Sequence, residues 1–384
     1  DFGFFNSRLT GTIDAYWNTT KDLLMKTAIP GITGFTSTYA NVGQTSNKGI
    51  EIALQGVLVK TRDWNVTAGF NINFNRGKVD KLADNVTGLY GTEWATSSTF
   101  PKSDYVLKEG RPVGLVRGLT ADGFYTTDDF TYENGVYTLK EGVADVSSAV
   151  FPNYHLHNGM NERPAGQLAY PGMAKFKDLN DDGIINDDDV DVIGDMTPVH
   201  TGGFNINATY KNFDLGLYFN WSYGNEIYNV NKLAALYGYK EGAVYENKLS
   251  IVKDCYKIYD VVNGELVALT TPEQLNAANA NAKLPLAYSE NGYVSTLGIE
   301  DGSYLRLNTL TLGYTLPKSM LQKAGISNLR VYGSIYNVFT ITGYSGIDAE
   351  VSTSTSTKTY PQLGMDWGTY PRARSFVLGV NLSF

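Results

Sequence analysis

Residues 201–223, TGGFNINATYKNFDLGLYFNWSY, decide the fold. They contain two alternating runs, 201–211 and 213–223, with only Asn212 between them. In both runs every second side chain is apolar: Phe204, Ile206, Ala208 and Tyr210, then Phe213, Leu215, Leu217, Phe219 and Trp221. Most residues between them are Asn, Thr, Gly or Ser. Because successive side chains of a strand point to opposite faces, the segment predicts two neighbouring strands with one apolar and one polar face.

The same alternation recurs along the chain. Four more segments alternate cleanly: 8–17, 50–59, 64–74 and 376–384. Two further segments, 303–316 and 328–340, are strand-like, but their alternation slips near Asn308 and near Asn337. A β-bulge or a different register would explain the slip.

The apolar faces of the six clean strands carry no Asp, Glu, Lys or Arg. A Lys or Arg at the middle of a bilayer would cost about 2–4 kcal/mol on a lipid-facing strand, so this pattern favours contact with lipid. Aromatic residues also stand at strand ends, where interfacial girdles form: Trp17, Trp64, Phe74, Tyr210, Phe213 and Trp221. A soluble β-sandwich alternates too, but the polar faces here lack the mixture of Lys and Glu that a solvated sheet carries.

Composition narrows the class further. The chain has 384 residues, 40 Gly, 27 Tyr, 18% charged residues and a net charge of −8, which argues against a nucleic-acid partner. Cys255 is its single cysteine, so no internal disulfide forms. No run reaches the roughly 18 apolar residues of a spanning helix. A helical membrane protein is thereby excluded, and a barrel remains open.

Connection lengths give an independent indication of the fold. Four long connections are expected, at 18–47, 75–200, 224–302 and 341–373, and they alternate with short ones at 60–62, Asn212 and 317–327. In an antiparallel meander this places every long loop at one end. Outer-membrane barrels combine long external loops with short periplasmic turns. The sequence therefore predicts an all-β, transmembrane antiparallel β-barrel with long extracellular loops and a periplasmic C-terminus.

The first residues, 1–5, show no secretion signal. Because the long loops would also fill more than half of the chain, we expect residues 1–384 to be the C-terminal part of a larger barrel whose first strands precede residue 1.

Several segments resemble the SusC/RagA class of TonB-dependent transporters from Bacteroidetes. They are NVGQTSNKGIEIAL (41–54), WNVTAGFNINFNRGKVDKL (64–82), FKDLNDDGIINDDDVDVIGDMTP (176–198), GGFNINATYKNFDLGLYFNWSYGNEIYN (202–229), YLRLNTLTLGYTLPKSML (304–321), NLRVYGSIYNVFTITGYSGIDAEV (328–351) and YPRARSFVLGVNLSF (370–384). Two positions depart from the family pattern: Ala349 and Ala373 stand where proline is frequent.

The resemblance implies a barrel of 22 strands, of which this chain supplies the C-terminal ones, and a plug in the absent N-terminal part. It implies active import of oligosaccharides or peptides across the bacterial outer membrane, with a SusD-like lipoprotein as lid and the TonB–ExbB–ExbD complex as motor. The alternative is a passive porin or an adhesive surface barrel without energy coupling. A secreted β protein that binds or cleaves glycans is a third interpretation.

An acidic segment matches a 12-residue calcium loop. Its expected ligands are Asp178, Asn180, Asp182, the carbonyl of Ile184, Asn186 and Asp189, with Gly183 at the sixth position. Position 12 is Asp189 where the EF-hand has Glu, which shortens the reach of that ligand. We expect a structural calcium ion that orders a long loop; the alternative is an acidic, solvated turn.

Aromatic residues in the expected external loops are candidates for stacking on a sugar cargo: Tyr90, Trp94, Tyr105, Tyr125, Tyr154 and Trp367. The alternative for each of them is packing within the loops. Catalysis has little support, because the chain has three histidines and no G-x-S-x-G motif. The sequence therefore predicts a transport protein without catalytic residues or a catalytic cofactor.

Overall fold

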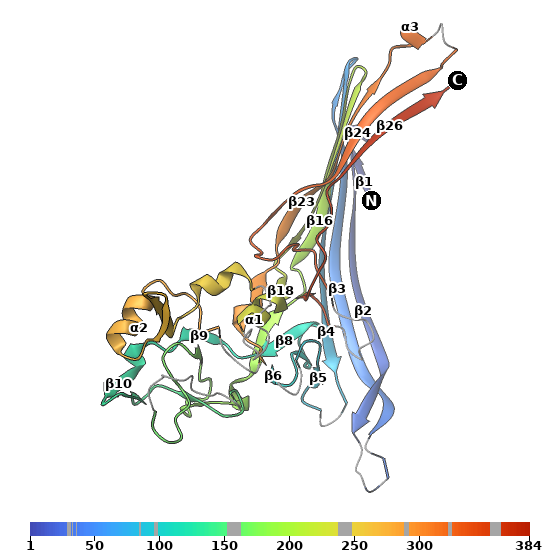
Figure 1. Cartoon of the computed structure of the whole chain (residues 1–384). Coiled ribbons are helices and arrows are strands. Elements are labelled where there is room, and N and C mark those ends of the chain that lie inside the picture. The colour runs from blue at the N-terminus through green and yellow to red at the C-terminus, as the bar shows by residue number, and fades with distance from the viewer. Residues whose placement is uncertain are drawn as a thin grey trace.

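The computed structural model describes residues 1–384 except 29–31, 33, 36, 84–85, 96–98, 152–162, 237–247, 288–291, 322–324 and 354–361. Its largest element is one nine-stranded sheet, in which each strand pairs with its neighbours in antiparallel fashion (Figure 1). In spatial order the strands are β1 (Phe2–Phe4), β2 (Leu9–Ala28), β3 (Ser37–Lys60), β4 (Trp64–Lys81), β16 (His200–Tyr210), β17 (Phe213–Tyr223), β23 (Tyr304–Thr315), β24 (Asn328–Thr342) and β26 (Ser375–Ser383). The antiparallel all-β prediction is confirmed.

The register places the alternating faces side by side across the sheet. Ile206 lies opposite Ala68 on one side and Leu217 on the other, and Leu217 lies opposite Leu310. The adjacent row joins Asn205 with Tyr218 and other polar positions. Because a shift of one residue would exchange the two faces, this register fixes one apolar and one polar face for the whole sheet.

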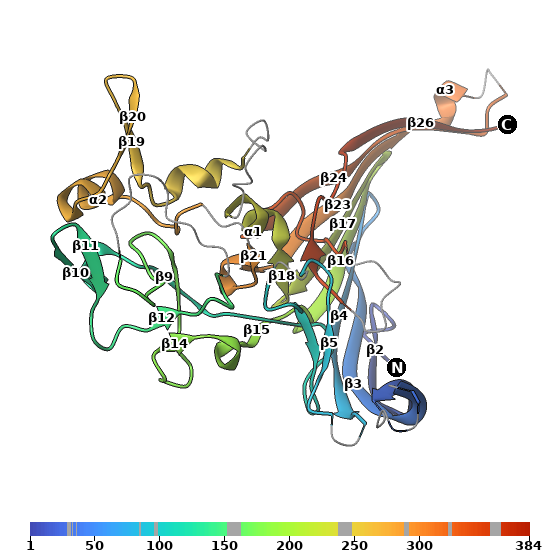
Figure 2. The same cartoon turned by 60° about the horizontal axis from the view of Figure 1, so that its bottom comes forward.

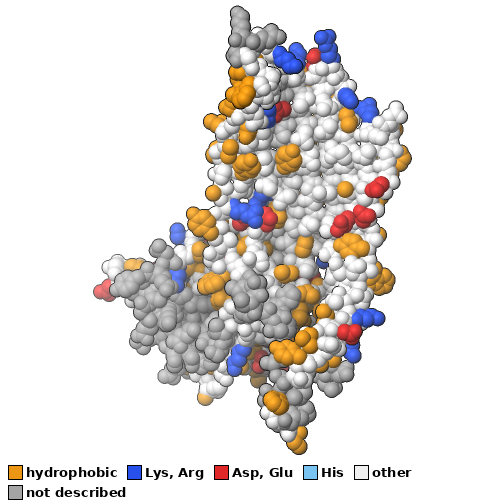
Figure 3. Space-filling view, turned by 90° about the vertical axis from the view of Figure 1, so that its right-hand side faces the viewer, with side chains coloured by type: hydrophobic (Ala, Val, Ile, Leu, Met, Phe, Trp, Pro, Cys, Tyr) orange, Lys and Arg blue, Asp and Glu red, His pale blue; other side chains and the backbone are white. Residues whose placement is uncertain are grey.

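The apolar row is not buried beneath a second layer. Trp17 is 78% exposed and Leu378 is 89% exposed, and other large apolar side chains of these strands share this exposure. A soluble sandwich would cover such a row with a second sheet. Figure 3 shows one broad side of the molecule, where white backbone and uncharged polar side chains prevail and charged groups are few.

Three strands are longer than predicted. β2 and β3 stay paired up to Ala28 and Ser37, so the predicted loop 18–47 is wrong and the connection covers only 29–36. β4 likewise continues to Lys81, so the next loop begins at 82 rather than 75. The backbone ladder continues where the side-chain alternation has stopped, because strand pairing needs backbone N–H and C=O groups rather than an apolar face.

Both slips in alternation are β-bulges. Asn308 is an extra residue of β23 relative to β17, since Tyr218 pairs with Thr309 and Phe219 with Leu307. β24 carries the neighbouring irregularity at Asn337, whose φ of 53° is left-handed. Bulges were one of the two explanations that the sequence left open.

The long connections gather at one end of the sheet, and the turns 61–63 and 211–212, the helix α3 (Lys318–Leu321) and the C-terminus lie toward the other end (Figure 1). The connections predicted at 224–302 and 341–373 agree with the strand ends within two residues. Among the described residues, no helix is long and apolar enough to cross a membrane.

The connection between β4 and β16 folds into short strands and turns (Figure 2). They are β5 (Leu89–Gly91), β6 (Thr99–Phe100), β7 (Tyr105–Leu107), β8 (Leu115–Gly118), β9 (Ala121–Phe124), a 3₁₀ turn (Thr127–Asp129), β10 (Phe130–Glu133), β11 (Val136–Leu139), β12 (Asp145–Val146), β13 (Ala174–Phe176), β14 (Ile184–Ile185), a 3₁₀ turn (Asp187–Asp189) and β15 (Asp191–Asp195).

The connection between β17 and β23 holds β18 (Glu226–Asn229), α1 (Val230–Leu236), a 3₁₀ turn (Ser250–Asp254), β19 (Tyr259–Val262), β20 (Glu265–Ala268), α2 (Pro272–Asn279), β21 (Gly292–Tyr293), a 3₁₀ turn (Thr296–Gly298) and β22 (Ile299–Asp301); β25 (Met365–Asp366) lies in the last long loop. These loops, not the large sheet, contain the apolar cores. They therefore form a folded platform at one end of the sheet.

Candidate functional site

The loops join the large sheet at a three-stranded junction. β18 lies between β22, with which it pairs antiparallel, and β25, with which it pairs in parallel. The last long loop is thus tied to the platform through backbone hydrogen bonds. Side chains that surround this junction decide how firmly the loop is held.

Asp366 of β25 is the first of these side chains. Its carboxylate accepts hydrogen bonds from the Tyr344 hydroxyl at 2.6 Å, from Nδ2 of Asn231 at 3.0 Å and from the Thr369 hydroxyl at 2.8 Å. Burial raises the pKa of Tyr344, and the contact with Asp366 raises it further. Tyr344 therefore stays protonated and can keep donating to the carboxylate.

Glu300 of β22 is the second. It accepts hydrogen bonds from the backbone N–H and the hydroxyl of Ser345, both at 2.9 Å, and pairs with Nζ of Lys232 at 3.1 Å. Burial alone would raise the pKa of Glu300, but the bonds from Ser345 and Lys232 lower it overall. The carboxylate is thus held in its ionised form between two loops.

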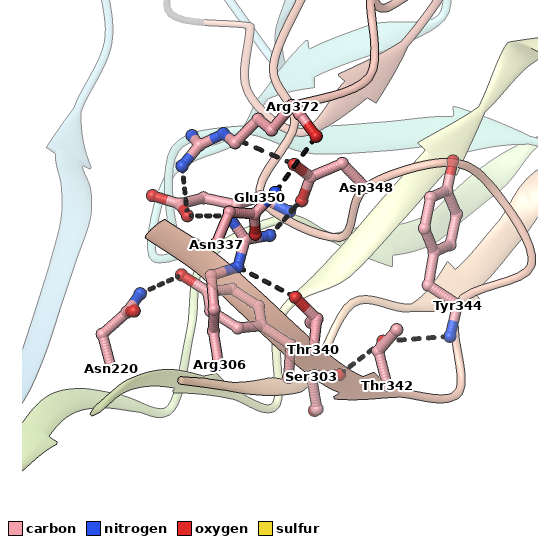
Figure 4. Close-up of polar contacts among 11 residues, drawn as sticks. Asn220, Ser303, Arg306, Asn337, Thr340, Thr342, Tyr344, Asp348, Glu350 and Arg372 are labelled. Carbon is pink, nitrogen blue, oxygen red and sulfur yellow. Dashed lines mark hydrogen bonds and ion pairs between the residues drawn. The ribbon is translucent and has the colours of Figure 1, made fainter. Parts of the chain in front are cut away.

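Four charged side chains form the third anchor, the arginine–carboxylate network of Arg306, Asp348, Glu350 and Arg372 (Figure 4). Arg306 projects from β23 and is only 3% exposed. Its guanidinium contacts the carboxylate of Asp348, lies 3.2 Å from Glu350 and donates through Nε to the Thr340 hydroxyl at 3.0 Å. A buried charge is tolerated only when it is paired and hydrogen-bonded, as here.

Arg372 closes the network from the far end of the loop. It lies 3.4 Å from Asp348 and 2.9 Å from Glu350. Its backbone carbonyl accepts a hydrogen bond from Nδ2 of Asn337, the bulge residue of β24, at 3.0 Å. The network therefore attaches both ends of the β24–β26 connection to the beginning of β23.

The sequence did not single out these anchors. One signal was present: Arg306 is a charged residue in a strand-like segment, two residues before the bulge at Asn308. Its partner Asp348 is 42 residues away in a loop, and no spacing rule connects the two.

The predicted aromatic contacts divide into two groups. Tyr90 is 51% exposed, with the guanidinium of Arg117 4.8 Å from its ring centre, and Trp367 is 48% exposed. Trp94 is half-buried against the ring of Tyr228. Tyr154 lies outside the described residues. Tyr90 and Trp367 thus remain open to a ligand.

Tyr105 and Tyr125 pack inside the platform instead, which corrects their assignment as cargo contacts. Both rings are buried in apolar cores. Their hydroxyls donate to backbone carbonyls, Tyr105 to Leu363 at 2.8 Å and Tyr125 to Ala144 at 2.6 Å. A tyrosine is useful there because its ring fills a core while its hydroxyl satisfies a loop carbonyl.

A buried carboxylate holds Trp94 in place. Asp104 is fully buried and accepts hydrogen bonds from the backbone N–H groups of Glu93, Trp94 and Ala95 at 2.8–3.0 Å. Burial raises the pKa of Asp104, while these three donors act in the opposite direction. The half-buried Trp94 therefore rests on a fixed backbone rather than on a free loop.

The acidic segment adopts a closed loop. The N–H of Gly183 donates to Oδ2 of Asp178 at 2.7 Å, and the N–H of Ile184 donates to Asp182 at 2.9 Å. Gly183 has a φ of 84°, a left-handed conformation that glycine adopts without strain. The turn that the sequence predicted at the sixth position is present.

Asp189 closes this loop from inside. It is fully buried, and its two oxygens accept hydrogen bonds from the N–H groups of Leu179 at 2.7 Å and Asn186 at 2.8 Å. In the described part of the chain, no group of three or more His, Cys, Asp or Glu side chains is gathered for a metal ion. Calcium binding by the predicted ligands therefore stays a prediction.

Calcium is expected to raise the melting temperature of the full-length protein, and EDTA is expected to lower it again. An ion present at 100 times its dissociation constant stabilises the folded state by about 2.7 kcal/mol. Asp182→Asn keeps an oxygen but removes a charge and should weaken the response. Asp128→Asn, at an exposed aspartate outside the loop, is the matched control. Melting followed by fluorescence would show this; an identical melting temperature with calcium and with EDTA would contradict a structural ion.

Comparison with known proteins identifies relatives of this chain. No family model matches the chain. The chain is 30% identical to TonB-dependent receptor P3 of Formosa agariphila and 28% identical to TonB-dependent receptor SusC of Bacteroides thetaiotaomicron. Both matches cover 100% of this chain, and 33% and 31% of the two relatives. The chain thus spans about a third of the length of the curated relatives it matches, and their names are those of receptors, not of enzymes.

A solved structure shares the fold. The RagAB peptide transporter superimposes on 100% of this chain, and on 34% of its own, with a TM-score of 0.67 and 24% sequence identity. That identity supports a common fold only. In sequence the chain is thus similar to about one third of TonB-dependent receptors such as SusC, and in fold it is similar to the RagAB peptide transporter.

Proposed function

We propose that this chain is part of the barrel wall of an active nutrient importer in the bacterial outer membrane. The observation that carries the proposal is a match between the whole of this chain and about a third of a TonB-dependent receptor, in a chain whose sheet has one exposed apolar face. The importer would take up oligosaccharides or peptides, with TonB–ExbB–ExbD as the source of energy. The relatives favour this importer over a passive porin.

We infer the orientation of the protein from the difference between the two ends of the sheet. We place the loop platform outside the cell and the short turns with the C-terminus in the periplasm, because outer-membrane barrels carry their long loops externally. A SusD-like lipoprotein would then meet the protein at the platform. Anchors such as the arginine–carboxylate network would give that partner a firm surface, since rigid loops lose less entropy on binding.

Uptake by cells that carry the full-length protein tests the proposal. Accumulation of labelled oligosaccharides and peptides is measured with and without TonB. Energy-coupled import predicts that accumulation above the external concentration is lost without TonB, while the amount of protein in the membrane is unchanged. Equal uptake in both strains would support passive diffusion and contradict the proposal. Purification through a tag should also recover a lipoprotein partner.

A further inference from the structure

The apolar face of the sheet ends in a pair of cations where β3 and β4 approach the loop platform. Lys48 of β3 and Arg76 of β4 lie directly opposite each other in the register. They belong to the same face as Ile50 and Phe74, which form the preceding row two residues away. Because a strand rises about 3.3 Å per residue, the cations lie about 7 Å beyond that apolar row.

Aromatic side chains mark this level of the sheet as the boundary of its lipid face. Trp17 of β2 lies opposite Lys48 and is 78% exposed. Phe74 is also exposed, and the centre of its ring lies 5.4 Å from that of His200. Tryptophan and other aromatic side chains are enriched where the hydrocarbon of a bilayer meets the headgroups. In a bilayer, the charged ends of Lys48 and Arg76 would therefore lie at the depth of the headgroups.

The protein does not neutralise either cation. Among the described residues, no carboxylate forms an ion pair with Lys48 or Arg76. Both side chains are exposed, and Arg76 donates to a neutral partner, the carbonyl of Pro198, at 3.3 Å. The next carboxylate along β4 is Asp80, which is already engaged, since it lies 3.1 Å from Nζ of Lys78. The pair therefore retains two positive charges at one point of the surface.

Two like charges in this position repel each other. Directly opposite residues of neighbouring strands have Cβ atoms about 5 Å apart, and like charges there destabilise a sheet. The repulsion is stronger where hydrocarbon of low dielectric constant adjoins the charges. One anion between the two side chains would remove the repulsion and pair with both. A phosphate group suits the pair, because a guanidinium can donate two parallel hydrogen bonds to it while a lysine ammonium adds a point charge.

From this arrangement we propose that Lys48 and Arg76 bind the phosphate group of an anionic lipid in the leaflet next to the loop platform, with the acyl chains of that lipid against Trp17 and Phe74. A lipid is favoured over free phosphate because the cations border an exposed apolar surface, which acyl chains cover and a free ion does not. The inference rests on the location of the sheet in a membrane. It does not depend on the cargo or on energy coupling by TonB.

The test uses the full-length protein, purified in a neutral detergent. Native mass spectrometry measures the binding of phosphatidylglycerol, which is anionic, and of phosphatidylcholine, which is neutral overall; a parallel series contains inorganic phosphate as a competitor. Lys48→Gln/Arg76→Gln removes both charges. Lys257→Gln/Lys283→Gln is the matched control, because it removes two exposed lysine charges from the connection between β17 and β23. Lys48→Arg/Arg76→Lys exchanges the two cations and keeps both charges.

The parent is expected to prefer phosphatidylglycerol, and Lys48→Gln/Arg76→Gln should bind it about thirtyfold more weakly, since each cation near an anionic lipid surface contributes about fivefold. Lys48→Gln alone should lose about fivefold, the exchanged variant should keep most of the affinity, and the control should match the parent. Equal losses in the control and in Lys48→Gln/Arg76→Gln, or no loss in either, would overturn the site. Displacement of the lipid by an equal concentration of inorganic phosphate would overturn the lipid as its ligand.

Discussion

Replacing Leu217 with arginine is expected to prevent most of the protein from folding into the outer membrane, whereas arginine at the neighbouring Tyr218 is expected to be tolerated there. Leu217 lies midway between Phe213 and Trp221 in β17 and pairs with Ile206 and Leu310 on the apolar face. At the middle of the bilayer the new charge would cost about 2–4 kcal/mol. That amount is a large fraction of the stability of a folded protein.

Tyr218 is the matched control because it belongs to the same strand and points to the opposite face, where water can hydrate a new charge. Unfolding in urea from phospholipid bilayers measures the difference in free energy, and the shift of the folded band in gels without heating measures the yield. A similar loss at both positions would mean that the two faces have the same environment, as in a protein that does not face lipid on one side.

Replacing Arg306 with methionine is expected to cause the second-largest loss of stability. The substitution preserves much of the side-chain volume but removes the main partner of the buried Asp348. An unpaired buried carboxylate costs about 3–5 kcal/mol, and Arg372 at 3.4 Å would offset only part of that cost. The loop from 343 to 374 should then detach from β23 and become sensitive to protease.

Arg330→Met provides the comparison on the adjacent strand. Its pair with Asp214 is also an arginine–aspartate pair, but both side chains are about a quarter exposed, so the expected loss is about 0.2–1 kcal/mol. The double substitution Arg306→Met/Asp348→Leu should recover stability, because it removes the buried charge together with its partner. Thermal melting measures the loss of stability, and limited proteolysis measures the detachment of the loop. Equal effects of Arg306→Met and Arg330→Met would show that burial of the network has no energetic consequence.

The strands of the large sheet could be predicted from the sequence wherever their two faces lie in different environments. β17 is the clearest case: lipid on one side and a polar interior on the other impose a period of two on every residue from Phe213 to Tyr223. The prediction lost accuracy beyond Trp17, where β2 and β3 continue as a ribbon. There neither face selects strongly for apolar side chains, so the pattern fades while the backbone ladder continues.

The loop residues show the opposite situation. From the sequence, Tyr90, Tyr105 and Tyr125 were equal candidates for contact with a ligand. In the structure Tyr105 and Tyr125 are buried, whereas Tyr90 is exposed. Their difference depends on which distant segment packs above them. Tyr105, for example, donates its hydroxyl to Leu363, which is 258 residues away along the chain. No local pattern records such a contact.

The amino-acid sequence by itself determined the two-faced antiparallel sheet and the placement of long connections at one end. It also offered β-bulges as one of two explanations for the slips in alternation near Asn308 and Asn337. It did so because strand alternation and turn length are local consequences of the environment. Only the tertiary structure decided that Arg306 meets Asp348 and that Tyr105 is a core residue. Each of these depends on the register of several strands or on the folding of one loop over another, and such long-range packing leaves no periodic signal in the chain.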